Sequence, residues 1–367
     1  MPGFRLRGLP QRHSAEHGVA SDASRPLREF EANPDYYRGK PRIERVVLKF
    51  DPGGRLTELL SGNVDVISVA NPVEIPALQE DPRFRVLQEP DGDVRVLAWK
   101  CDHPLFRDAR VRRALTFAID RHELQRLLNT TATIPVVDGI VPVWDQLHGR
   151  APSPLPYDPA RARALFDEAG WVDRDGDGIR ERGGRPFRFT LLVPGGGQSP
   201  WVTTAVFVRE QLRELGVQME LQPLDRAVVQ ERIRSGEFEA ALEWGRTGVA
   251  WLRGMFGDGS PLSYRNPVVT DLIDRLAGTA DPTERRGIYQ ALIGVFQEEA
   301  PVTFLGPVAW TVFVHRRLRG LSSPWRTHPL QFMDRAMARG MTGVHPSSLA
   351  PGGCRDSWTA TWRPCGS

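Results

Sequence analysis

Between residues 187 and 244 the chain alternates regularly between strand-type and helix-type patterns, and this restricts the possible fold more than any other feature. Short apolar runs with two-residue alternation are typical of strands, and apolar residues three or four positions apart are typical of helices. The segments are, in order, strand 187–193, helix 201–215, strand 217–224, helix 226–234 and strand 238–244. Strands separated by helices of this length predict an α/β architecture.

Aspartates precede three further helix-type patterns. Asp108, Asp158 and Asp281 each stand before such a pattern, where a carboxylate can accept hydrogen bonds from the free N–H groups of the first turn. Pro159 and Pro282 follow two of them at the first helical position, which tolerates the missing N–H of proline. We also expect helices at 54–61 and 267–277, strands at 46–50 and 64–69, one or two strands within 302–315, a pair of strands within 83–100, and a loop at 245–265.

Composition and charge limit the classes of protein that the sequence can encode. A chain of 367 residues, 40% of them hydrophobic, is long enough for two folded domains. The basic residues gather at the ends: residues 316–367 contain eight arginines and two aspartates, and the middle of the chain is acidic. Nucleic-acid binders more often carry a basic stripe on the folded body, so we expect no nucleic-acid partner.

Targeting and membrane signals are weak. The longest apolar stretch, Val302 to Val314, has 13 residues and contains Gly306 and Pro307. A membrane span needs roughly 20 apolar residues. The first 13 residues, MPGFRLRGLPQRH, have no apolar run of signal-peptide length. The sequence as it stands therefore predicts neither an export signal nor an anchor.

Two motifs are weak candidates for ion binding. Asp173, Asp175 and Asp177 match the start of a calcium loop, but its twelfth position is Gly184 instead of the bidentate glutamate. A solvated hairpin turn, with the aspartates bonded to their own backbone, is the favoured alternative. The glycines at 195–197 lack the Gly-Lys-Ser/Thr of a phosphate loop and fit a flexible connection. We expect neither a metal nor a cofactor.

The sequence has no pattern of an enzyme active site. His122-Glu123 is not followed by a second histidine four positions on, and no Gly-x-Ser-x-Gly occurs. Cys101, Cys354 and Cys365 form neither a disulfide framework nor a metal-binding pair. We therefore expect a binding protein and not an enzyme.

The strand 238–244 ends in an aromatic residue that is followed by a guanidinium group. Trp244 is followed by Gly245, Arg246 and Thr247. An aromatic ring and an arginine at a strand end suit capture of a ligand by stacking and charge. The alternative is a core tryptophan beside a surface arginine.

Several segments across about 32–325 resemble, in their order and spacing, the family 5 extracellular solute-binding proteins. These are the peptide/nickel-type receptors of ABC importers. The segments are ANPDYYRGKPRIERVVLKF, LLSGNVDV, HPLFRDARVRRALTFAIDRHEL, YDPARARALFDEAGWVDRDGDGIRERGGRPFRFTLLV, VREQLRELGVQMELQPLD, GEFEAALEWG and NPVVTDLIDRLAGTADPTERRGIYQALIGVFQEEAPVTFL. Each motif is moderately specific, and their shared order makes the resemblance strong.

The resemblance implies a two-lobed, periplasmic-binding-protein-like (type II) α/β fold that closes on a solute and presents it to a membrane permease. Family members are longer, so the chain resembles an N-terminally truncated member with one lobe incomplete. We expect a monomer that binds a peptide-like or other small solute in the periplasm or outside the cell. The expected parts are an irregular segment 1–31, lobe I at 32–99, lobe II at 100–305, a return to lobe I at 306–330 and a disordered tail at 331–367.

The same resemblance implies that ligand-binding residues follow the strand 238–244. Trp244, Gly245, Arg246 and Thr247 are the expected ligand-binding residues, and Trp99 is a weaker candidate. Peptide-binding members carry an aspartate for the ligand's amino group shortly after this tryptophan. Here no aspartate follows Trp244 before Asp258, so Arg246 indicates an anionic or carboxylate-bearing solute.

Two alternatives remain open from the sequence. One alternative is that the chain is a non-functional remnant of such a receptor. The other is that it is an enzyme whose site the motifs do not reveal. The identity of the solute and of the permease, and ion binding by the Asp173 turn, are also open.

Overall fold

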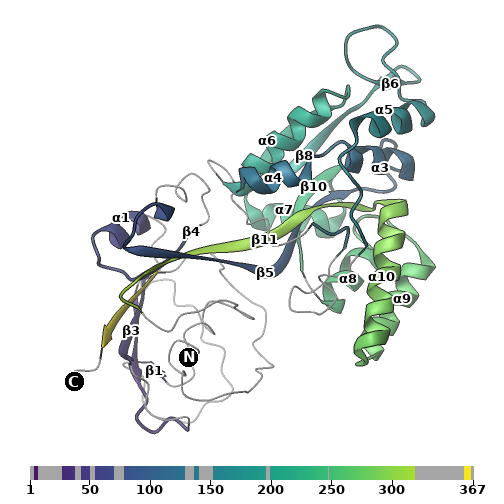
Figure 1. The fold of residues 1–367 in the computed structure, drawn as a ribbon. Coiled ribbons are helices and arrows are strands. Elements are labelled where there is room, and N and C mark those ends of the chain that lie inside the picture. Colours follow the sequence, from purple (N-terminus) through teal and green to yellow (C-terminus); the bar gives the residue numbers. More distant parts are fainter. Residues whose placement is uncertain are drawn as a thin grey trace. The chain divides into compact units, whose positions relative to one another are not determined.

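The computed structural model describes residues 4–6, 27–37, 43–49, 54–69, 78–128, 136–139, 152–195, 199–246, 248–318 and 359–364. The chain divides into two compact units. Unit 1 comprises Met1–Glu89 and Trp310–Ser367, and unit 2 comprises Pro90–Ala309. Figure 1 labels many of the helices and strands of both units.

The sheet of unit 2 contains both parallel and antiparallel pairs. Its strands lie in the order β11 (Val302–His315), β5 (Phe84–Trp99), β10 (Ala240–Gly245), β8 (Arg188–Pro194) and β9 (Gln218–Leu224). β8 pairs in parallel with β9 and β10, and β10 pairs antiparallel with β5. β5 and β11 also contribute residues to unit 1. The mixed sheet agrees with the α/β expectation.

The described helices of unit 2 are α3 (Ala109–Phe117), α4 (Arg121–Leu127), α5 (Pro159–Glu168), α6 (Pro200–Arg213), α7 (Arg226–Ser235), α8 (Val249–Phe256), α9 (Pro267–Gly278) and α10 (Pro282–Glu299). All except α4 and α8, which were not predicted, begin within one residue of the expected start. Asp108, Asp158 and Asp281 each accept a hydrogen bond from a main-chain N–H in the first turn of their helix. The three predicted caps are therefore confirmed.

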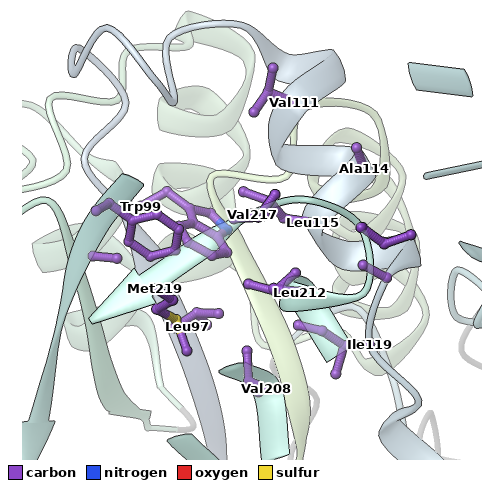
Figure 2. Close-up of a cluster of buried hydrophobic side chains, with 14 of the residues drawn as sticks. Leu97, Trp99, Val111, Ala114, Leu115, Ile119, Val208, Leu212, Val217 and Met219 are labelled. Carbon is purple, nitrogen blue, oxygen red and sulfur yellow. The ribbon is translucent and has the colours of Figure 1, made fainter. Parts of the chain in front are cut away.

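Helices cover both faces of this sheet. Successive residues of a strand point to opposite faces, so one strand contributes to two core clusters. Leu97 and Trp99 of β5 belong to one core cluster, which includes residues of α3, α5 and α6. Val96 and Ala98 belong to a second cluster, with residues of α8, α9 and α10. Figure 2 shows part of the first cluster, with Trp99 beside Leu97, Leu115, Val217 and Met219.

Unit 1 is built on antiparallel strands. They lie in the order β1 (Phe4–Leu6), β2 (Leu27–Ala32), β3 (Ile43–Lys49), β12 (Thr359–Pro364), β4 (Val66–Val69) and the end of β11. The short helix α1 (Arg55–Leu60) follows β3. Unit 1 has a buried apolar cluster that includes Leu59, Ile67, Phe84 and Phe313.

Both terminal segments differ from the sequence expectation. Strands β1 and β2 lie partly or wholly within 1–31, which we expected to be irregular, and β12 lies within the expected tail 331–367. β12 pairs with β3 and β4, far away in the sequence. Its residues Thr359, Thr361 and Trp362 favour a strand, but the pairing partners that make one cannot be found from a local pattern.

Three internal features also differ. The segment 83–100, expected as two strands, is the single strand β5, although Pro90 and Gly92 interrupt its apolar pattern. The expected loop 245–265 contains α8, whose buried residues Leu252, Met255 and Phe256 are spaced as on one face of a helix. The units divide after Glu89 and Ala309, whereas the sequence analysis placed the lobe boundaries after residues 99 and 305. Among the described residues, no helix is long and apolar enough to cross a membrane.

Candidate functional site

The candidate site lies at one edge of the unit 2 sheet. Because β8, β9 and β10 are parallel, their carboxyl ends meet at the same edge, and α6, α7 and α8 begin there. Ligands of open α/β sheets bind outside the carboxyl ends of the strands. Trp244 and Gly245 end β10, and Arg246 follows them directly, so the structure brings these three candidates to this edge. Thr247 lies outside the described residues.

Strand β10 separates from one of its neighbours at this edge. Its parallel pairing with β8 ends at Ala241, opposite Leu192. Its antiparallel pairing with β5 continues as far as Gly245, and Trp244 lies opposite Arg95. The end of β10 is therefore held by β5, and the pairing with β8 stops three residues before Trp244.

Trp244 is the centre of a small aromatic and cationic cluster. Its ring centroid lies 5.1 Å from that of Trp201, with 52° between the ring planes. The guanidinium carbon of Arg226 lies 3.8 Å from the centroid of the Trp244 ring. Trp201 comes from the first turn of α6, and Arg226 is the first residue of α7. All three side chains are partly exposed, so Trp244 is not simply a core tryptophan.

The other two described candidates differ in burial. Gly245 is buried within the strand, and Arg246 is partly exposed. A partly exposed guanidinium two residues after an indole on the same strand end can offer charge and a flat apolar surface together, as ligand sites commonly do. Whether Trp244, Gly245 and Arg246 bind a solute stays a prediction.

Glu243 is a residue of this edge that the sequence analysis missed. Burial raises the pKa of its carboxyl group, and the nearby Asp93 carboxylate adds to the increase. A hydrogen bond of 2.8 Å from the main-chain N–H of Trp244, together with the charges of Arg226 and Arg246, partly offsets it. An isolated acid in the apolar run AALEW was the signal that could have identified Glu243.

Strand β5 adds two buried charged residues close to this edge. Asp93 and Arg95 are only 6% and 8% exposed. One Nη1 donor of Arg95 lies 3.5 Å from the main-chain oxygen of Pro307. Among the described residues, Arg95, Arg226 and Arg246 bring three guanidinium groups to this edge, beside the carboxyl groups of Asp93, Asp225 and Glu243.

The expectation for Trp99 is wrong in this structure. Its side chain is fully buried, between Phe106 and Phe189 of the unit 2 core. Its indole N–H donates to the Thr303 hydroxyl at 3.2 Å. Side chains two positions apart on a strand point to the same face, so Trp99 lies on the same face as Leu97, and both belong to the same core cluster.

The Asp173 turn has the geometry of the favoured alternative. The two carboxylate oxygens of Asp173 accept from the main-chain N–H groups of Gly176 at 2.8 Å and Gly178 at 3.0 Å. Asp175 and Asp177 each accept from an N–H two residues on. The three exposed aspartates place carboxylate oxygens within 4.8 Å of one another, but they already satisfy the backbone of the turn.

A comparison with protein families decides the relationship of this chain. Residues 25–256 match the family model of bacterial extracellular solute-binding proteins, family 5 Middle. The chain belongs to this family. The match includes the strand β10 and the residues around Trp244, so the candidate site lies within the family region.

Curated relatives match a large part of the chain at low identity. The chain is 23% identical over 295 residues to the oligopeptide-binding protein AppA of Bacillus subtilis, a match that covers 76% of this chain and 53% of AppA. It is 27% identical over 217 residues to di/tripeptide-binding protein 2 of Pseudomonas aeruginosa, covering 58% of this chain and 38% of that protein. The chain thus spans about half the length of the first relative and less of the second.

Solved structures confirm the type II binding-protein fold. AppA of Bacillus subtilis, in complex with a nonapeptide, has a TM-score of 0.68 at 20% identity and covers 91% of this chain and 65% of its own. NikA of Brucella suis, in complex with Fe(III)-EDTA, has a TM-score of 0.72 at 22% identity, with 84% and 65% covered. The periplasmic oligopeptide-binding protein of Thermotoga maritima has a TM-score of 0.73 at 18% identity, with 85% and 66% covered.

Proposed function

We propose that this chain is the solute-binding receptor of an ABC importer, which binds a small solute and delivers it to permease subunits in the membrane. Family membership supports this function, since two relatives are named as peptide-binding proteins. The observation that carries the proposal for unit 2 is the partly exposed Trp244, which contacts Trp201 and Arg226 where three parallel strands end. The receptor acts as a monomer outside the cytoplasm.

We propose further that the solute carries a carboxylate. Arg246 provides a charge that is not neutralised at any working pH. The segment after Trp244 has no acid before Asp258, so it offers no obvious partner for a free amine. Trp244 would supply a flat apolar surface, and Gly245 would let the solute approach the backbone.

Calorimetric titration of the full chain with two matched peptides tests this function. The probes are N-acetyl-trialanine, which has a free carboxylate, and its C-terminal amide, which has none. We expect the acid to bind more tightly than the amide. Replacing Arg246 by Ala should weaken binding of the acid by about 1.5–3 kcal/mol, the usual worth of a hydrogen bond to a charged group.

Two variants define the control. Trp244→Ala should weaken binding of both peptides, because the apolar surface serves either one. Arg213→Ala alters a guanidinium in the last turn of α6 that is 69% exposed, and should change neither affinity. A wild-type chain that binds neither peptide would contradict a peptide-like solute and would favour a non-functional remnant.

A further inference from the structure

We propose that Arg226 is a second specificity-determining residue of this site, and that it engages a carboxylate group of the solute together with Arg246. The inference rests on the proposed function, because it names the solute chemistry of the same site. Arg226 was not a candidate in the sequence: it lies 18 residues before Trp244, and the fold brings the two side chains together.

The Arg226 guanidinium lies over the ring of Trp244. At 3.8 Å from the ring centroid, the group is in contact with the indole. A guanidinium that stacks through its face keeps its N–H donors in its own plane, directed away from the ring. Such a group is suited to bidentate hydrogen bonding with a carboxylate, and its orientation does not have to be established by the solute.

Trp244 is itself held in place. Its ring contacts Trp201 from α6, and its strand is fixed by the antiparallel pairing with β5 up to Gly245. The Arg226 guanidinium therefore rests on a side chain that is positioned by two other elements. This is the arrangement that a preorganised charge needs.

The charges around the stack favour an anion. The groups that face Glu243 are Arg226 from α7, Arg246 after β10 and Asp93 from β5, and Arg95 lies opposite Trp244 on β5. With Asp225, which caps α7 beside Arg226, three guanidinium groups stand beside three carboxyl groups. When Glu243 takes up a proton, two carboxylates are left, and the net charge of these groups becomes positive.

A coupling between solute and proton follows. Arg226 and Arg246 lower the pKa of Glu243 through their charges, and a solute carboxylate bound to them would weaken this effect and repel the Glu243 carboxylate. Binding of the anionic solute therefore favours the protonated form of Glu243, so protons are taken up from the solvent. Because burial already raises the pKa of Glu243, this uptake occurs closer to neutral pH than for an exposed glutamate.

The experiment compares N-acetyl-trialanine with its C-terminal amide on the full chain, in wild type, Arg226→Gln, Arg226→Lys and Arg246→Ala. Arg226→Gln should weaken binding of the acid at least tenfold and change binding of the amide less than twofold. Arg226→Lys should keep part of the preference for the acid, because lysine keeps the charge but not the planar fork. The ratio of acid to amide affinity is a readout that loss of a merely structural contact would leave unchanged.

Proton uptake is measured by repeating the titration of the acid in two buffers of different ionisation enthalpy between about pH 5 and about pH 8. Wild type should take up protons as the acid binds, and Glu243→Gln should not. An Arg226→Gln variant that keeps the wild-type ratio, while Trp244→Ala loses binding, overturns this inference and leaves the proposed function standing. Wild type that binds neither peptide overturns both. If Arg226→Gln fails to fold, the Arg226→Lys ratio and the Glu243→Gln proton balance decide.

Discussion

Arg112 of α3 donates hydrogen bonds from Nε and Nη2 to the main-chain oxygen of Glu299, 187 residues later in the chain, at 2.9 and 2.5 Å. Nε of Arg112 also lies 3.2 Å from the main-chain oxygen of Ala300, and Nη1 donates to the main-chain oxygen of Phe106 at 2.6 Å. Glu299 ends α10, so the guanidinium satisfies carbonyl groups that a helix end leaves without partners. A cation is also favoured there by the helix dipole.

Arg112→Met should therefore lower the free energy of unfolding by about 3 kcal/mol, because the buried carbonyl groups at the end of α10 lose a charged donor. Arg126→Ala is the matched control. That side chain is 71% exposed and pairs with Glu123 one helical turn away, so its loss should cost no more than about 0.5 kcal/mol. Urea unfolding of both variants measures the difference, and equal losses would refute the role of Arg112.

The buried ion pair between Arg121 and Asp138 should show strong energetic coupling. The side chains are 3% and 4% exposed, and Arg121 also donates to the main-chain oxygen of Phe304 at 3.1 Å. Removing one partner leaves the other group buried without its partner charge, so Arg121→Met or Asp138→Asn alone should lower the free energy of unfolding by about 3–5 kcal/mol. The double variant should lose clearly less than the sum.

A double-mutant cycle gives the coupling energy, which should exceed about 1 kcal/mol. The exposed pair Arg234 and Glu231, with side chains 70% and 65% exposed, is the control. Its coupling should stay below about 0.5 kcal/mol. Additive losses at Arg121 and Asp138 would show that each side chain acts alone.

Local signals explain why much of unit 2 could be predicted. Asp108, Asp158 and Asp281 cap helices through bonds to residues two or three positions on, so the sequence contains the whole interaction. The strand and helix alternation from 187 to 244 likewise lies within one stretch of chain. The predicted helix starts were correct for this reason.

The features that were missed depend on residues far apart in sequence. β12 becomes a strand by pairing with β3, and neither segment indicates the other. In the candidate site, the position of Trp244 at a strand end could be predicted, but its contacts with Trp201 and Arg226 could not. Trp99 was misjudged because its location near a strand end does not reveal the side to which it points.

Glu243 should make the stability of the protein depend on pH. Burial raises the pKa of its carboxyl group above the ordinary 4.5, so the folded state binds the proton more tightly than the unfolded chain. The free energy of unfolding therefore falls as pH rises from about 4.5 through the raised value, since the folded state then loses a proton that it favours. Glu243→Gln removes this dependence and keeps an acceptor for the Trp244 N–H.

We expect Glu243→Gln to match wild type near pH 4 and to be the more stable protein at pH 7. Thermal unfolding of both across this range gives the comparison. A difference that grows toward acid would mean that the carboxylate is stabilised in the folded state, contrary to its burial.

Gly306 in β11 should tolerate no side chain. Its φ of +129° lies in a region that L-residues rarely adopt. A Cβ atom built there would lie 2.6 Å from Nε2 of Gln125, a buried amide nitrogen without a hydrogen-bond partner among the described residues. Gly306→Ala therefore adds backbone strain and displaces the flexible end of the Gln125 side chain, and should cost about 1–3 kcal/mol of the free energy of unfolding, mostly through the strain.

Two further variants separate the causes. Gln125→Ala combined with Gly306→Ala relieves the clash but not the strain, so it should be less destabilising than the sum of the single changes. Gly294→Ala, in the middle of α10 with open space around the added methyl group, should instead stabilise by up to about 1 kcal/mol. Urea unfolding checks all three. Backbone strain does not depend on the neighbouring side chain. If the double variant were as stable as Gln125→Ala alone, the contact with Gln125, and not the strain, would be what excludes a side chain at Gly306.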